Sequence, residues 1–164
     1  MEKRKPTRLK DYDYSSDGYY FITVCTANKE KILCNIVGDG ALDVPKIILS
    51  DKGKIVEKYI KSSNNIPSIN ICKYVIMPNH IHILVNVQNG FINGTSWVPS
   101  PTNKTIPHFV STLKRFINKE LGGNIFQRSF YDHIIRDEND YLRIWEYIDT
   151  NPQKWAEDKY FVAD

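Results

Sequence analysis

Two strand-like segments that follow each other almost without interruption constrain the fold of this sequence most. Residues 69–77 (INICKYVIM) and 80–87 (HIHILVNV) are rich in β-branched and other apolar residues, and only Pro78 and Asn79 separate them. Proline and asparagine favour turns, and strands joined by so short a connection pair antiparallel. The two segments therefore predict an antiparallel hairpin in the middle of the chain.

The rest of the chain alternates between strand patterns and amphipathic helices. Ser50 and Asp137 can cap helices that begin directly after them, and Gly122 can end another. The expected strands are residues 19–25, 31–36 and 129–135, and the expected helices are residues 51–63, 107–121 and 137–151. The predicted buried stripes are Phe109, Val110, Leu113, Phe116 and Ile117 on the second helix and Tyr141, Ile144, Trp145 and Ile148 on the third. We expect an α+β protein with a ferredoxin-like antiparallel sheet and helices packed on it.

A chain of 164 residues suits one domain with a single core. We expect residues 1–164 to form it, with residues 1–15 as a flexible basic arm and residues 88–105, rich in Gly, Asn, Ser, Thr and Pro, as a mobile loop. The sequence has no apolar run of 18 residues or more and no signal-peptide pattern, which predicts a cytoplasmic protein without membrane contact. The three cysteines lack CxxC spacing, so they are expected to be reduced structural thiols.

The charge of the chain does not by itself indicate a nucleic-acid partner. Lys and Arg number 22 against 19 Asp and Glu, a formal net charge of +3, and proteins that bind no nucleic acid often show such a balance. Lys114, Arg115, Arg128 and Arg136 could pair with phosphates. Charged positions of this kind are, however, usually a solvated face.

The second strand of the hairpin begins with His80 and His82, two residues apart. Side chains at this spacing leave a strand on the same face, while Ile81 and Ile83 point to the opposite face and into the core. Two neutral imidazoles side by side can share a divalent metal ion. An H-x-H pattern alone is more often a pair of solvent-facing histidines, so both interpretations stand at this point.

The third helix carries a second candidate pair, Tyr147 and Asn151. Their spacing of four residues places a phenol and a carboxamide on one helical face. The alternative is a surface aromatic residue followed by a helix C-cap before Pro152, and the pair alone favours that alternative.

Three segments together resemble the single-tyrosine HUH transposases, and most of all the REP-associated tyrosine transposases. They are YYFITVCTANKE near the N-terminus, MPNHIHILV at residues 77–85 and SFYDHIIRDENDYLRIWEYIDTNPQKW at residues 129–155. The HUH signature, histidine, bulky hydrophobic residue, histidine, matches His80, Ile81 and His82. The tyrosine motif of the family matches YIDTNP, and the resemblance spans the chain from about residue 19 to residue 155.

This resemblance implies an HUH endonuclease fold and a set of site residues. His80, His82 and Asn151 would hold Mg²⁺ or Mn²⁺. Tyr147 would be the nucleophile that forms a 5′-phosphotyrosine, although Tyr131 and Tyr141 lie nearby in the sequence. The substrate would be single-stranded DNA that forms hairpins, and the DNA-binding residues would be Lys114, Arg115, Arg128 and Arg136.

The expected function is therefore that of a transposase-type, metal-dependent single-stranded DNA endonuclease and strand transferase, acting as a monomer or homodimer. One alternative is a catalytically silent protein on the same fold that binds DNA hairpins or regulates through them. Another is an RNA- or protein-binding module on a ferredoxin-like sheet, in which the histidines and the tyrosine have no chemical role.

Overall fold

The computed structural model describes residues 16–38, 44–88, 91–92, 95–96 and 105–163. The predicted basic arm, residues 1–15, lies outside these ranges. Most of the loop predicted at residues 88–105 also lies outside them, and its described part contains a short strand pair, β6 (Phe91–Ile92) and β7 (Thr95–Ser96). Among the described residues, no helix has the length and apolar character needed to cross a membrane.

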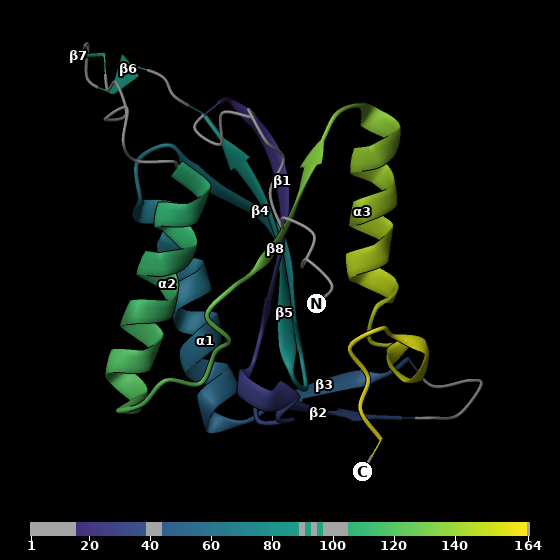
Figure 1. The fold of residues 1–164 in the computed structure, drawn as a ribbon. Coiled ribbons are helices and arrows are strands. Elements are labelled where there is room, and N and C mark those ends of the chain that lie inside the picture. Colours follow the sequence, from purple (N-terminus) through teal and green to yellow (C-terminus); the bar gives the residue numbers. More distant parts are fainter. Residues whose placement is uncertain (1–15, 39–43, 89–90, 93–94, 97–104, 164) are drawn as a thin grey trace, which may run out of the picture.

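A four-stranded antiparallel sheet forms the centre of the molecule (Figure 1). Its strands are β1 (Gly18–Cys25), β4 (Ile69–Met77), β5 (His80–Val87) and β8 (Tyr131–Ile135), in the spatial order β4-β5-β1-β8. The hairpin predicted from the sequence is β4 and β5. Strand β1 pairs along its whole length with β5, from Gly18 opposite Val87 to Cys25 opposite His80.

Three helices cover the two faces of this sheet. Helices α1 (Asp51–Ser62) and α2 (Thr105–Leu121) lie on one face, and α3 (Glu138–Thr150) lies on the other (Figure 1). The strand order, with both crossover helices on one face, is that of a ferredoxin-like α+β fold, as the sequence predicted. The short 3₁₀ helices are η1 (Ala27–Lys29), η2 (Ser63–Asn65) and η3 (Trp155–Glu157).

The helix ends follow the expected capping chemistry. The side chain of Ser50 accepts a hydrogen bond from the amide of Gly53 at 3.0 Å, and that of Asp137 accepts from the amide of Asp140 at 2.8 Å. Gly122, directly after α2, has a φ of 70°, which a residue with a side chain rarely adopts.

The alternating side chains of the sheet build two separate cores. Residues such as Ile81, Ile83 and Val85 pack under α1 and α2. On the opposite face, Phe21 and Leu84 pack with Ile144 and Ile148 of α3. The sheet is therefore buried on both faces, and the face under α3 also carries the two histidines of β5.

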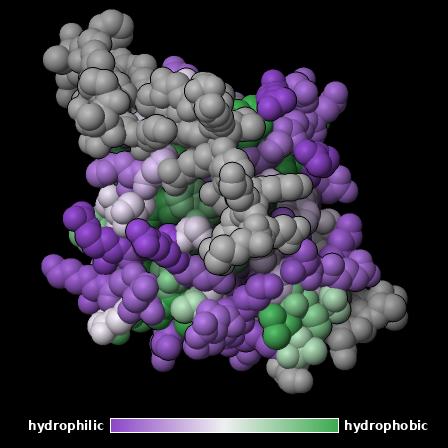
Figure 2. Space-filling model, in the orientation of Figure 1, coloured by the Kyte–Doolittle hydropathy of each residue, from purple (hydrophilic) through white to green (hydrophobic). Residues whose placement is uncertain are grey.

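Two sequence-based expectations on the strands needed correction. The strand predicted at residues 31–36 is β2 (Cys34–Val37), and it pairs with β3 (Lys46–Leu49), which the sequence pattern had not indicated. Both strands are only four residues long and partly exposed, so their hydrophobic alternation is weak. Figure 2 shows a hydrophobic patch at the lower right of an otherwise mostly hydrophilic face, over this hairpin, where Val37, Val44 and Ile48 are exposed.

The buried stripes of the helices were mostly predicted correctly. Phe109, Val110, Leu113 and Ile117 are buried, but Phe116 is 43% exposed and stacks on Tyr59 of α1 at 6.0 Å between ring centroids. On α3, Ile144 and Ile148 are buried, while Tyr141 and Trp145 are only partly covered. The three cysteines are free thiols, as expected.

Candidate metal and tyrosine site

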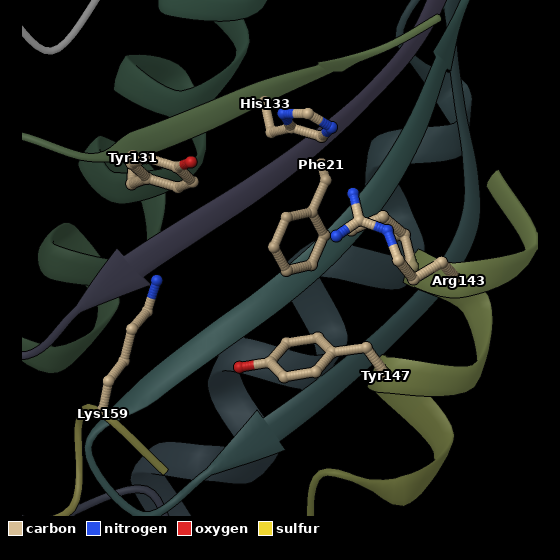
Figure 3. Close-up of a pocket in the computed structure, with 7 residues that line it drawn as sticks. Phe21, Tyr131, His133, Arg143, Tyr147 and Lys159 are labelled. Carbon is tan, nitrogen blue, oxygen red and sulfur yellow. The ribbon is translucent and has the colours of Figure 1, made fainter. Parts of the chain in front are cut away.

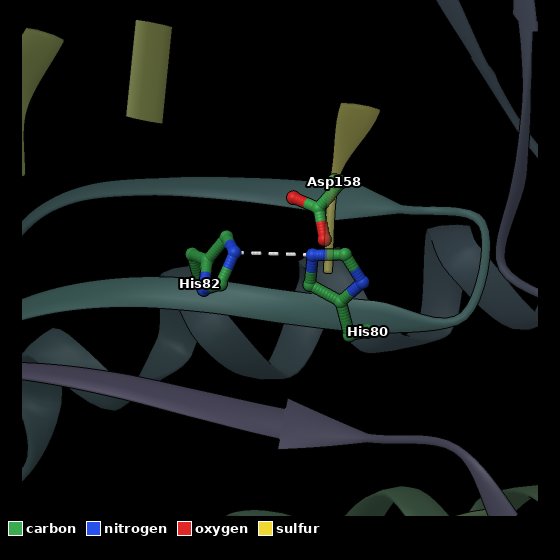
Figure 4. A group of neighbouring side chains, drawn as sticks. All are labelled: His80, His82 and Asp158. Atoms are coloured by element: carbon green, nitrogen blue, oxygen red, sulfur yellow. Dashed lines mark hydrogen bonds between the residues drawn. The ribbon is translucent and has the colours of Figure 1, made fainter. Parts of the chain in front are cut away.

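The two histidines of β5 are fully buried on the face of the sheet that α3 covers. His80 and His82 are both 0% exposed, and the intervening Ile81 lies in the core on the opposite side. Their Nε2 atoms are 3.0 Å apart, and Figure 4 marks this contact with a dashed line. The solvent-facing interpretation of the H-x-H pattern is therefore wrong.

Each imidazole is held by a hydrogen bond at its other ring nitrogen. Nδ1 of His82 lies 2.8 Å from Oγ1 of Thr23 on the neighbouring strand. Nδ1 of His80 lies 2.9 Å from Oδ1 of Asn79. Because Nδ2 of Asn79 donates to the carbonyl of Tyr160 at 2.8 Å, its oxygen is the atom that faces His80, and Nδ1 of His80 carries the proton. Such contacts orient histidines that bind metals by Nε2.

The buried surroundings keep both rings neutral at ordinary pH. Burial lowers the pKa of His80 to about 4, against the opposing influence of the Asp158 carboxylate. The pKa of His82 is also lowered, first by burial and then by His80 beside it. Neutral imidazoles are the form that binds a metal ion, so the pair is ready for this role without losing protons.

Helix α3 brings the second candidate pair to the same place. The hydroxyl of Tyr147 lies 3.4 Å from Nε2 of His82 and donates to Oδ2 of Asp158 at 3.3 Å. Asn151, one turn later, is 2% exposed, and its Nδ2 donates to the same Oδ2 at 2.8 Å. Asn151 is the C-cap of α3, as the alternative interpretation had it, but it is buried against Asp158. Tyr147 is not a simple surface aromatic residue, because its hydroxyl reaches His82.

Asp158 is the residue of this site that the sequence did not indicate. It lies after η3 in the C-terminal segment, and its Oδ1 accepts a hydrogen bond from the amide of Tyr160 at 2.7 Å. His80, His82 and Asp158 each offer one ligand atom, and these atoms all lie within 4.8 Å of one another (Figure 4). The ring of Tyr160 packs on His80 with 4.6 Å between centroids. No local pattern marks Asp158, since only the return of the chain to the sheet brings it here.

The donor atoms of this cluster fit a divalent metal ion. Two ligand atoms about 2.1 Å from a metal and at right angles to each other lie about 3.0 Å apart, the separation typical of octahedral coordination. The two Nε2 atoms have this separation. Oδ1 of Asn151 is buried and accepts no hydrogen bond from the described part of the chain, so a carboxamide oxygen is left for a further ligand bond. Two imidazoles with oxygen ligands suit Mn²⁺ better than Mg²⁺.

The environment of Tyr147 disfavours its ionised form. Burial, the nearby carboxylate of Asp158 and the hydrogen bond to it raise the pKa of Tyr147 to about 12. The phenol therefore carries its proton at neutral pH, and an attack by its oxygen requires an acceptor for that proton.

The other two tyrosines considered as nucleophiles have different ring contacts from Tyr147. Tyr141 packs against Tyr19, with ring centroids 5.0 Å apart, and against Trp145. Tyr131, on β8, is 44% exposed and has Lys159 over its ring at 5.0 Å. Of the three candidates, Tyr147 is the one whose hydroxyl reaches His82.

The four predicted DNA-binding cations are not gathered around Tyr147. Nζ of Lys114 donates to the carbonyls of Gln127 and Ser129 at 2.8 and 3.0 Å, and burial lowers its pKa to about 8. Arg115, Arg128 and Arg136 are exposed. The pocket beside Tyr147 has Arg143 and Lys159 in its lining instead. A DNA-binding role for the four predicted residues stays a prediction.

The site thus combines a buried H-x-H pair with a tyrosine and an asparagine on a facing helix, the arrangement that the HUH signature implies. No family model matches the chain. An uncharacterized protein of Haemophilus influenzae is 33% identical over an alignment of 177 positions. The alignment covers 99% of this chain and 95% of that protein. A second H. influenzae protein, assigned as a REP-associated tyrosine transposase, is 22% identical over 87% of this chain and 74% of its own length.

A solved structure has a similar fold. It is that of a REP-associated tyrosine transposase bound to a REP hairpin, with a TM-score of 0.63 and 19% sequence identity, covering 93% of this chain and 76% of that one. In sequence and in fold, the chain is similar to REP-associated tyrosine transposases. This similarity confirms the resemblance predicted from the sequence.

Proposed function

We propose that this protein is a metal-dependent endonuclease and strand transferase that cuts single-stranded DNA at hairpin-flanked sites through a 5′-phosphotyrosine. The observation that carries the proposal is the Tyr147 hydroxyl, 3.4 Å from the buried histidine pair. A nucleophile in contact with side chains that can bind a metal ion can act on the phosphate that the ion would hold. The solved relative bound to a REP hairpin supports folded single-stranded DNA as the substrate. Such a substrate is consistent with a cytoplasmic protein that works as one domain.

In this proposal His80, His82 and Asn151 would hold Mg²⁺ or Mn²⁺, and the Asp158 carboxylate lies beside the two histidines. The bound ion supplies charge stabilisation to the phosphate as it reacts. Thr23 and Asn79 keep the two rings turned toward each other through their Nδ1 atoms. The ligand geometry is thus fixed before DNA arrives.

The covalent step is an exchange of phosphate esters. The Tyr147 oxygen forms a bond to phosphorus, and the bond between phosphorus and the 3′ oxygen of the preceding nucleotide breaks. The phenolic proton passes to Oδ2 of Asp158, which already accepts its hydrogen bond, and the leaving 3′ oxygen takes up a proton to become a hydroxyl. The reverse exchange with a 3′-hydroxyl rejoins the strand, and because the ester bond is conserved, no nucleotide cofactor is required.

The test is the formation of a protein–DNA adduct. The full chain is incubated with a pool of single-stranded hairpin DNAs and Mn²⁺ and analysed on a denaturing gel. We expect an adduct with the native protein, none with Tyr147→Phe, and an undiminished adduct with Tyr141→Phe, a matched change on the same helix. His80→Ala and His82→Ala should each abolish it, because each removes a metal ligand.

Thermal unfolding of each variant separates lost chemistry from lost folding. An adduct that persists in folded Tyr147→Phe would move the nucleophile to another residue, Tyr131 first. Cleavage that persists in both histidine variants at ordinary metal concentrations would contradict the metal assignment.

One observation favours a second candidate function, a catalytically silent protein that binds DNA hairpins. His80 and His82 are 0% exposed, and Tyr160 and Trp155 pack on His80. The C-terminal segment thus covers the two rings, which leaves no exposed imidazole surface for a phosphate. Tight hairpin binding by the native protein with no adduct at any Mn²⁺ concentration would select this second function.

A further inference from the structure

A pocket of about 430 Å³ opens directly beside Tyr147 on the α3 side of the sheet (Figure 3). Its walls come from β1 (Phe21), β8 (Tyr131 and His133), α3 (Arg143 and Tyr147) and the C-terminal segment (Lys159). The volume lies within the range of small-molecule sites, about 300–1,000 Å³. The pocket therefore has room for one nucleotide, and the candidate nucleophile forms part of its wall.

Two aromatic side chains of the pocket, Phe21 and Tyr131, differ in how much ring surface is exposed to a ligand. Phe21 is 5% exposed and already packs on His82 and Tyr147, with ring centroids 4.9 and 5.9 Å apart. Tyr131 stands at the rim and is 44% exposed. Figure 3 shows its ring beside the end of the Lys159 side chain. An exposed ring at the mouth of a pocket can stack on an unpaired base, a contact that every base can make.

Two cationic side chains accompany this ring. Nζ of Lys159 lies 5.0 Å from the centre of the Tyr131 ring and 4.9 Å from that of Tyr160. The side chain of Arg143 is 70% exposed and pairs with Asp140, which also accepts from Nε2 of His133 at 2.7 Å. Two carboxylates contact side chains of the pocket, Asp140 at Arg143 and His133 and Asp158 at Tyr147. Arg143 and Lys159 are the cationic side chains of the lining that can meet a phosphate.

We propose that this pocket is the subsite for the unpaired nucleotide next to the scissile phosphate, with Tyr131 stacked on its base and Arg143 and Lys159 at its phosphates. The inference rests on the proposed function, because it takes Tyr147 as the residue that the phosphate must reach. A base inserted beside Tyr131 cannot remain paired with a second strand. The pocket therefore gives a physical reason why the substrate is single-stranded. The metal-ligating side chains alone do not provide such a reason.

The test measures binding without chemistry. Fluorescence anisotropy in EDTA compares the full chain with a labelled eight-nucleotide oligothymidylate and with an abasic oligomer of the same length. Both probes carry the same phosphates, but only the first carries bases. Tyr131→Ala should weaken oligothymidylate binding by roughly 5- to 100-fold and leave abasic binding nearly unchanged. Tyr131→Phe, which keeps the ring, should restore native affinity.

Arg143→Gln and Lys159→Gln should weaken binding of both probes. Each should also reduce the slope of log affinity against log salt by about 0.7, the value for one phosphate contact on a single strand. The matched controls lie on the opposite face of the sheet: Phe116→Ala removes a ring that is 43% exposed, and Lys52→Gln removes an exposed cation. Neither should change the affinity for either probe.

Equal losses for both probes in Tyr131→Ala, or no loss for either, would overturn the subsite. So would a loss in Phe116→Ala as large as that in Tyr131→Ala. The outcome is independent of the adduct experiment. A base-selective loss of binding in Tyr131→Ala without any adduct would sustain the subsite and contradict the catalytic proposal. An adduct without this base-selective loss would sustain the catalytic proposal and contradict the subsite.

Discussion

Replacing Asn151 with aspartate tests the most specific feature of the site, the contact between a buried carboxamide and the half-buried carboxylate of Asp158. Nδ2 of Asn151 donates to Oδ2 of Asp158 at 2.8 Å, and Asn151 is 2% exposed. In Asn151→Asp a carboxylate oxygen replaces the donor. Two unit charges at that distance repel by about 6 kcal/mol at an effective dielectric constant of 20. Protonating one of the two carboxyl groups at pH 7 removes this repulsion and costs about 4 kcal/mol. This cost is therefore the upper limit of the destabilisation.

Since the side chains can also move apart, we expect Asn151→Asp to lower the free energy of unfolding by about 3 kcal/mol in EDTA at pH 7. The sign of the pH dependence follows from the repulsion, which favours a proton on the folded pair. Because the folded variant then binds more protons than the unfolded chain, the penalty grows above the ordinary carboxyl pKa and shrinks as the pH falls toward about 4. A divalent ion between the carboxylates removes the repulsion, so Mn²⁺ should stabilise the variant more than the native protein.

Urea unfolding at pH 7 and pH 4.5, with EDTA or with MnCl₂, measures these effects. Asn70→Asp, which adds a carboxylate at an exposed position of β4, is the control for the added charge and should change stability little. If Asn151→Asp is as stable as the native protein in EDTA at pH 7, the contact with Asp158 does not have the energy argued here. If Mn²⁺ stabilises the variant and the native protein equally, the ion does not bind between these side chains.

Two further predictions concern the framework around the site. Gly53→Ala should destabilise the protein by about 2 kcal/mol or more, although alanine favours a helix by about 1 kcal/mol, because its Cβ would lie 2.0 Å from the carbonyl oxygen of Leu33. Urea unfolding checks this against Lys52→Ala on the same helix, and a stabilised Gly53→Ala would refute the close approach. Burial raises the pKa of Cys34 to about 12, so thiol reagents should label this residue in the native protein at pH 8 far more slowly than in urea, and faster as the pH rises toward that value. Rapid native labelling, located by mass spectrometry, would show that Cys34 is reached without unfolding.

Elements with a strong hydrophobic period could be predicted from the sequence, and the weaker ones could not. Strand β5 has alternate residues in two different cores, so its faces follow from the sequence alone. Strand β3 is four residues long and half exposed, and only its pairing with β2 defines it. Glycine disfavours a helix, and local propensity does not show the close approach to Leu33, twenty residues earlier, that requires Gly53 in α1.

The site shows the same division at the level of single residues. The periods of a strand and of a helix place His80 beside His82 and Tyr147 beside Asn151, because each pair lies within one element. Asp158 reaches the histidines only because the chain turns back after η3, and nothing within the last segment signals this contact. The position of such a residue in a site can be recognised only when the packing is known.

The choice between Tyr141 and Tyr147 also depended on packing. Six residues of helix separate them, about 9 Å along the axis. Ile144 and Ile148 fix the position of α3 against Phe21 and Leu84, and this contact decides which tyrosine meets which part of β1 and β5. Tyr141 thereby meets Tyr19, near the far end of β1, and Tyr147 meets His82. Six residues also leave the two side chains about 120° apart around the helix axis, so they face different neighbours. The resemblance to a family selected Tyr147 in advance, and the hydrophobic period placed Tyr141 in the buried stripe of the helix.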